Sequence, residues 1–168
     1  SITTTGKTTG GRHGIYAKSS GKGDLSITTT GDTKGNWDFK KDKSNGGTDG
    51  VGIFAEINNT ASTGDLTINA ADTTGGQFGI KAVNKGKGAL SITTTGTTTG
   101  TAKDGIYARN FGTSLTINAA TTTGGRYGIK ARNSGTGALS ITTTGETTGG
   151  TAKDGIVSIK DGNSGDLT

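Results

Sequence analysis

The chain has 168 residues, of which 33 are glycine, and it contains no proline, cysteine or methionine. The absence of cysteine excludes disulfides and thiol chemistry, and no apolar run approaches the ~18 residues that a transmembrane helix needs. The formal net charge of +5 at pH 7 fits either solvated outer faces or an acidic polysaccharide or cell-surface partner.

A short Ser/Thr-rich segment recurs along the chain. Most copies read Leu-Ser-Ile-Thr-Thr-Thr-Gly or Leu-Thr-Ile-Asn-Ala-Ala, and their central isoleucines are 24 or 25 residues apart except for one step of 41. The copies lie at residues 1–6, 25–31, 66–71, 90–96, 115–120 and 139–145. A period of this length predicts a solenoid. Apolar residues two apart predict a strand with one buried and one outward face.

A second motif appears once per period and begins with Gly-Ile. Its copies lie at residues 14–17, 52–55, 79–82, 105–108, 128–131 and 155–158. It predicts a second strand, and the Thr-rich segment between the two motifs predicts a third, shorter one, for example at residues 97–99. No window has the apolar spacing of a helix, and enrichment in Thr, Ile and Gly also argues against helix.

These patterns predict an all-β fold, a single-stranded parallel β-helix of about six coils. Because one coil buries few apolar side chains against the entropy of ordering it, neighbouring coils must stack. We expect one domain over residues 1–168 with an inserted loop at residues 36–50. Since the chain begins and ends inside repeat units, we expect a segment of a longer rod. Residues 66–114 and 115–163 match each other, which indicates a repeating unit of two coils.

The insertion is the strongest candidate binding site in the sequence. It contains the only tryptophan of the chain, followed by one further aromatic residue and three lysines. These residues are Trp37, Phe39, Lys40, Lys41 and Lys43. An insertion in a repeat forms a loop on one face, often the binding face, and Trp beside cations is typical of contact surfaces. The alternative is a loop that folds back and caps the rod.

Outward positions of the Gly-Ile strand form two predicted stripes along the rod. The first stripe consists of Tyr16, Phe54, Lys81, Tyr107, Lys130 and Val157. The second stripe consists of Lys18, Glu56, Val83, Arg109, Arg132 and Ile159. Tyr16, Phe54, Tyr107, Arg109 and Arg132 are candidate partner-binding residues. Exposed strands also favour Tyr, Lys and Arg for structural reasons, so both interpretations stay open.

Several recurring polar residues are interpreted as structural. Asn84, Asn110 and Asn133 recur four residues after the motif Ile, where stacked amides satisfy turn backbone groups. The aspartates recur before the strands as turn residues, and the single histidine, His13, is predicted to be exposed in a glycine turn. We expect no catalytic, cofactor or metal site, because no His cluster, calcium repeat or triad is present.

Three alternatives to a binding protein remain on sequence grounds. The first is a polysaccharide-acting enzyme, which would need carboxylates clustered on one face. The second is a structural spacer stalk. The third is an ice-binding repeat, which the outward Thr-x-Thr pattern suggests, although residues such as Asn69 and Ala71 interrupt that pattern in every second coil.

Two stretches carry a resemblance to a known family. Residues 105–118 (Gly-Ile-Tyr-Ala-Arg-Asn-Phe-Gly-Thr-Ser-Leu-Thr-Ile-Asn) and 128–145 resemble the passenger repeats of bacterial type V autotransporters, with the closest similarity to those of Bartonella. The resemblance covers the chain apart from residues 36–50. It implies a right-handed β-helix, export through an outer-membrane barrel, and a place on the bacterial surface or secretion after cleavage.

The same resemblance implies a role in virulence at the host cell surface. Some passengers of this kind are adhesins, and others are released and act on endothelial cells as angiogenic, growth-factor-like ligands. We therefore expect a non-enzymatic, monomeric passenger. Its expected partner is a host cell-surface receptor protein or a matrix glycan, not a nucleic acid. No functional motif of the family maps onto individual residues here.

Replacing Trp37, Lys40, Lys41 and Lys43 together with alanine is expected to weaken binding to host cells, because the aromatic anchor and the cations are removed. The β-type circular dichroism should not change, since the repeats are untouched. Cell binding equal to that of the wild type would remove the insertion from the binding site.

Overall fold

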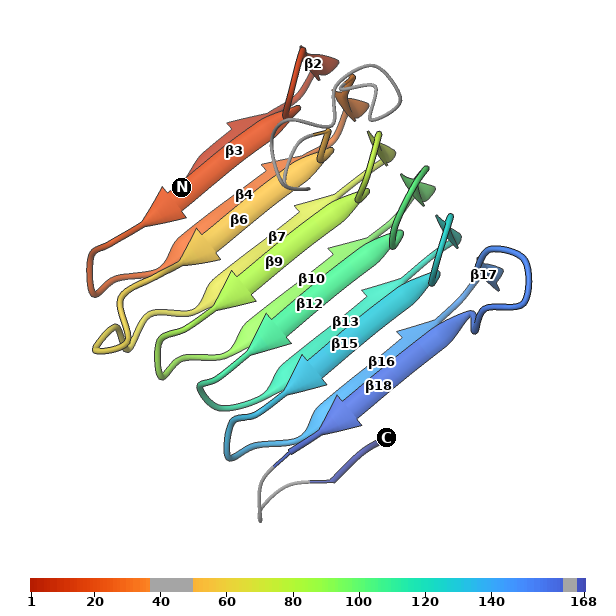
Figure 1. Ribbon diagram of the computed structural model, residues 1–168. Coiled ribbons are helices and arrows are strands. Elements are labelled where there is room, and N and C mark those ends of the chain that lie inside the picture. Colours follow the sequence, from red (N-terminus) through yellow and green to blue (C-terminus); the bar gives the residue numbers. More distant parts are fainter. Residues whose placement is uncertain (37–49, 162–165) are drawn as a thin grey trace, which may run out of the picture.

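The computed structural model describes residues 1–36, 50–161 and 166–168. These residues form 18 β-strands and no helix. The strands make three parallel six-stranded sheets, and each coil of the chain contributes one strand to each sheet. Figure 1 shows the coils following one another from the red end to the blue end of the rod, so that the two termini lie at opposite ends.

The three sheets take every third strand in order. The first sheet consists of β1 (Ile2–Thr4), β4 (Leu25–Thr29), β7 (Leu66–Ala70), β10 (Leu90–Thr94), β13 (Leu115–Ala119) and β16 (Leu139–Thr143). The second consists of β2 (Thr8–Gly10), β5 (Thr33–Gly35), β8 (Thr73–Gly75), β11 (Thr98–Gly100), β14 (Thr122–Gly124) and β17 (Thr147–Thr148). The third consists of β3 (Ile15–Ser19), β6 (Ile53–Ile57), β9 (Ile80–Asn84), β12 (Ile106–Asn110), β15 (Ile129–Asn133) and β18 (Ile156–Lys160).

The predicted fold class is confirmed: the chain is a right-handed parallel β-helix of about six coils. Equivalent residues of successive coils pair in register, as Ile68 does with Ile92 and Ile92 with Ile117. The predicted short strand at residues 97–99 lies one residue later, at Thr98–Gly100. Most of the long step of 41 residues is accommodated between β5 and β6, and the rest in the turn between β6 and β7. The register resumes at Ile53, which pairs with Ile15.

One continuous apolar core runs along the axis of the rod. It is built from Leu, Ile and Ala of the first and third sheets, and most of these side chains are fully buried. The second sheet contributes buried threonines instead, such as Thr98 of β11. A Cβ added at Gly79 would lie 2.6 Å from the Thr98 methyl carbon and 2.7 Å from the Gly105 carbonyl oxygen. The glycine of the Gly-Ile motif is therefore required by this close approach between coils.

A ladder of buried asparagines satisfies the corner between the third sheet and the next coil. Its members are Asn84, Asn110 and Asn133. The Asn84 amide nitrogen donates to the carbonyl oxygens of Gly88 at 3.0 Å and Ala89 at 3.2 Å. Its side-chain oxygen accepts the Gly86 N–H at 2.9 Å. The sequence prediction of a structural asparagine corner is thus confirmed.

Replacing Asn84 with alanine is expected to lower the free energy of unfolding by about 1–3 kcal/mol, because the buried Gly86 N–H loses its partner. Thr98→Val is the matched control, since the buried Thr98 hydroxyl has no hydrogen-bond partner among the described residues. Its stability should be unchanged or raised. Urea unfolding checks both variants, and equal effects of the two would contradict the assignment.

Candidate interaction surface

The outer face of the third sheet gathers the described candidate residues of both stripes. Tyr16 pairs with Phe54, and Phe54 with Lys81. Tyr107 pairs with Lys81 on one side and with Lys130 on the other. Both predicted stripes are therefore confirmed as stacked columns. Phe54, which was predicted to point outward, is buried and only 8% exposed, because Tyr16 and Phe78 pack against it. We call this face, with the corner that precedes it, the aromatic–cationic face.

The N-terminal part of this face is a cluster of aromatic rings. Tyr16 is 57% exposed and stacks on Phe54, with ring centroids 4.9 Å apart and planes at 8°. The His13 ring lies 5.3 Å from Tyr16 and 5.9 Å from Phe54. The prediction of an exposed, isolated His13 is wrong, because the residue two before the motif Ile lies beside the first outward residue of the strand and packs against it.

Sequence reasoning missed a corner column of residues two before each motif Ile. It contains His13, Val51, Phe78, Asp104, Tyr127 and Asp154. Backbone bonds link its coils: Gly52 N–H donates to Phe78 O at 3.0 Å, and Gly105 N–H to Tyr127 O at 3.0 Å. Val51, Phe54 and Phe78 form a second apolar cluster with Tyr107 against it. The constant offset from the Ile was the signal that would have found this column.

Cations of the face lie over these rings. Lys81 Nζ is 5.6 Å from the Phe54 centroid and 5.4 Å from that of Phe78. Arg109 Cζ is 4.4 Å from the Phe111 centroid, and Lys130 Nζ is 5.5 Å from that of Tyr127. Such contacts attract a cation to the ring face and hold it in place.

Burial lowers the pKa of Lys81, and the nearby charge of Lys103 lowers it further, while Glu56 opposes both. The pKa of Lys103 is also lowered, first by burial and then by the charge of Arg126, against the opposing charge of Asp104. The charged form of these lysines is thus less favourable here than in water. Lys81 and Lys103 are therefore partly desolvated and lie close to other cations.

Acidic residues on the face are held by cations of the same face. The Glu56 carboxylate forms ion pairs with Lys85, at 2.7 Å from Oε1 to Nζ, and with Lys18, at 3.4 Å from Oε2 to Nζ. Burial raises the pKa of Glu56, but the hydrogen bonds and charges of the two lysines outweigh burial and leave it below its ordinary value. Fully buried Asp104 accepts two bonds from Arg126, at 2.9 and 2.8 Å. The hydrogen bond to Asp104, opposed by burial, raises the pKa of Arg126.

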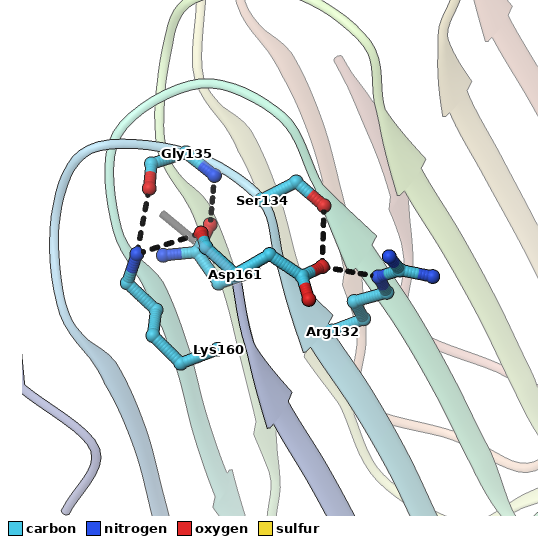
Figure 2. A network of polar contacts seen from close by, with 6 residues as sticks. Arg132, Ser134, Gly135, Lys160 and Asp161 are labelled. Carbon is cyan, nitrogen blue, oxygen red and sulfur yellow. Dashed lines mark hydrogen bonds and ion pairs between the residues drawn. The ribbon is translucent and has the colours of Figure 1, made fainter. Parts of the chain in front are cut away.

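Arg132 is directed into an internal network. Figure 2 shows its guanidinium paired with Asp161, which also accepts a bond from Ser134 Oγ at 3.1 Å. The hydrogen bond from Arg132 lowers the pKa of Asp161. Burial opposes this shift, whereas the hydrogen bond from Ser134 and the charges of Arg132 and Lys160 add to it. Lys160 occupies the position at which the three preceding coils have asparagine. Its Nζ donates to Gly135 O at 2.8 Å. Of the candidates, Arg132 is therefore the one whose charge is satisfied internally.

A groove crosses the face between β6 and β12. Its volume is about 350 Å³, and its walls include Phe54, Lys81, Tyr107, Arg109 and Phe111. A second hollow of about 380 Å³ lies beside Arg12, His13 and Tyr16. The structure thus brings the described candidates Tyr16, Phe54, Tyr107 and Arg109 to one continuous hollowed surface.

Trp37, Phe39, Lys40, Lys41 and Lys43 lie outside the described residues. The flanks of their segment are described, and both adjoin the corner of the aromatic–cationic face. Asn36 N–H donates to Gly10 O at 2.9 Å, and Gly50 O accepts the Gln77 N–H at 2.9 Å. The insertion therefore leaves and rejoins the β-helix at this corner.

The first sheet presents a different outer face, with small polar residues in two columns. Ser26, Thr67, Ser91, Thr116 and Ser140 form one column, and Thr28, Asn69, Thr93, Asn118 and Thr142 form the other. The residues that break the predicted Thr-x-Thr pattern therefore recur in alternate coils. No ring or charged side chain stands in either column.

No family model matches the chain, and no curated protein or solved structure matches it either. Within residues 1–36, 50–161 and 166–168, no group of three or more His, Cys, Asp and Glu side chains is placed to hold a metal ion. The same part of the chain has no helix that is long and apolar enough to span a membrane. The function is therefore inferred from the surface of the chain itself.

Glu56→Gln is expected to lower stability at neutral pH, because the ion pairs with Lys85 and Lys18 are lost. The pKa of Glu56 is lowered in the folded chain, so its contribution is present above the unfolded-state value of ~4.3. It is lost as the pH falls through the folded-state pKa. The difference from wild type should thus shrink and vanish once the pH is below that folded-state pKa.

Thermal unfolding between neutral and acidic pH measures this difference. The matched control is Glu146→Gln, because Glu146 is exposed and forms no ion pair among the described residues. Such a substitution should change stability little. A Glu56→Gln difference that persists unchanged at low pH would contradict the ion-pair assignment.

Proposed function

We propose that this chain is a non-enzymatic passenger segment of a bacterial type V autotransporter and binds a host cell-surface receptor or matrix component. The single observation that carries the proposal is the aromatic–cationic face. Its rings and cations are stacked in register over the third sheet, beside a groove of about 350 Å³. The β-helix fold and the repeat resemblance support the passenger identity.

The composition of the face favours binding over simple solvation. Aromatic residues and arginine are enriched in the centres of interfaces and carry much of their binding energy. Tyr16 stays 57% exposed although its ring is fixed against Phe54. A ring that is already ordered loses little freedom on binding, which favours affinity. The outer face of the first sheet offers no comparable anchor.

The cellular context of the proposal follows the resemblance. The passenger is exposed on the bacterial surface, or is secreted after cleavage and acts on vascular endothelium as an angiogenic ligand. In either place its action depends on contact with the host cell. The chain acts as a monomer whose rod exposes one continuous binding face.

The test is binding of the labelled chain to endothelial and epithelial cells. The Tyr16→Ala/Tyr107→Ala variant should bind about tenfold more weakly, because truncating an anchor residue commonly costs more than about 1 kcal/mol. Ser91→Ala/Thr93→Ala, on the outer face of β10, is the matched control and should bind like the wild type. Thermal unfolding of both variants shows whether the fold is retained.

Two results would contradict the proposal. One is wild-type binding by the tyrosine variant, which would place the contact elsewhere. The other is absence of binding to either cell type by the intact chain, which would favour the structural spacer.

A further inference from the structure

The central part of the aromatic–cationic face, from β6 to β15, has a period of two coils. Rings stand at Phe54 of β6 and Tyr107 of β12, and lysines stand at Lys81 of β9 and Lys130 of β15. Ring and cation thus alternate over the four coils from β6 to β15, whereas Tyr16 of β3 places a second ring beside Phe54 and Val157 of β18 ends the series. Because coils are spaced by ~4.8 Å, each kind of group recurs after ~10 Å. A ligand matched to this face has its own repeat of that length.

We infer that the aromatic–cationic face binds an acidic polysaccharide, extended along the axis of the rod. The inference rests on the proposed function and names the chemical class of the matrix ligand. One disaccharide of an extended polysaccharide has a length comparable to the two-coil period. Its anionic groups meet the cations, and its sugar rings stack through their C–H faces on accessible rings such as Tyr16 and Phe111, because Phe54 is buried beneath Tyr16 and Lys81.

Charge complementarity comes from cations that the protein does not neutralise itself. Among the described residues, the ion pairs involve Lys18, Lys85, Arg126 and Arg132. They do not involve Lys81, Arg109 or Lys130, which project outward from consecutive strands of the third sheet. Lys81 and Arg109 line the groove, and Lys130 extends the row of positive charge beyond it. Glu56 also lines the groove, where Lys18 and Lys85 neutralise it.

Arg109 supplies a second, independent observation. Its Nε is buried and has no hydrogen-bond partner among the described residues. Arg109 also lines the groove with Phe54, Lys81 and Tyr107. A buried donor without an acceptor is unusual in a folded protein, and a guanidinium is suited to a sulfate or carboxylate oxygen. Because Nε itself is buried, a ligand in the groove meets the part of the guanidinium that lines it.

The lysines fit the same ligand. Burial and the charge of Lys103 lower the pKa of Lys81, so an anion placed in the groove would relieve an unfavourable charge. An exposed ring also lines the groove: Phe111 is 40% exposed and lies against Arg109. An acidic segment of a globular protein has no translational repeat, whereas a polymer of identical units does. The repeating face therefore favours the polysaccharide over a protein.

The experiment is titration of the chain with heparin oligosaccharides near physiological salt, followed by calorimetry. The wild type should bind heparin and not uncharged dextran. Lys81→Gln/Arg109→Gln/Lys130→Gln should lose about tenfold or more in affinity. Lys7→Gln/Lys22→Gln/Lys34→Gln is the matched control, with the same change in net charge on other surfaces, and should stay within about twofold of the wild type.

Stability separates loss of binding from loss of fold. Lys81→Gln alone should unfold at the same temperature as the wild type or higher, because burial disfavours the charge that it removes. Weaker heparin binding together with an unchanged melting temperature supports the inference. Chemically desulfated heparin then distinguishes recognition of sulfates from recognition of carboxylates: lost binding indicates sulfates, and retained binding carboxylates.

Three outcomes would overturn the inference. The first is an equal loss of heparin affinity in the two triple variants, and the second is binding of polyglutamate as tight as that of heparin. The third is no binding of heparin by the wild type. If cells stripped of acidic glycans still bind the chain through Tyr16 and Tyr107, the partner is a protein and the proposed function stands. If the intact chain binds neither heparin nor cells, the proposed function fails as well.

Discussion

The backbone hydrogen bonding between equivalent residues of successive coils is the constraint on which the rest of this structure depends. Because the strands pair in parallel and in register, the backbone of each coil must follow the same course as the backbone of the coils next to it. At a core position, a residue must then pack beside the equivalent residue of the next coil. Ile columns, buried threonines against glycine, and the asparagine ladder all meet that condition, and the sequence repeats because the geometry repeats.

The same constraint explains how much of the fold the sequence predicts. The period of the central isoleucines predicts the coils and their stacking, and the position of Asn84 predicts the amide ladder, because both depend only on backbone register. Contacts between side chains of different columns are harder to predict. His13 was expected to be exposed, but it packs against Tyr16 and Phe54, since the corner angle brings the column two before the Ile beside the first outward column.

The aromatic–cationic face was predicted in part for the same reason. Its outward columns follow from strand alternation, so Tyr16, Phe54, Tyr107 and Arg109 were identified correctly as neighbours. The sequence analysis missed Phe78, Lys103 and Tyr127. These residues lie in turns, where the in-and-out alternation of strand side chains does not predict which way a side chain points. The satisfied charge of Arg132 depends on Asp161, which follows β18 in the sixth coil. Only the folded path of the chain reveals that pairing.

Alternation between rings and lysines also limits the electrostatic strain of a cationic column. Like charges on adjacent strands repel, and an aromatic ring between Lys81 and Lys130 doubles their separation along the rod. If the two-coil unit is the element that carries one ligand repeat, then each unit adds one contact site. Avidity for a long polymer would rise with every unit added, and the length of the rod would set the valency of the protein.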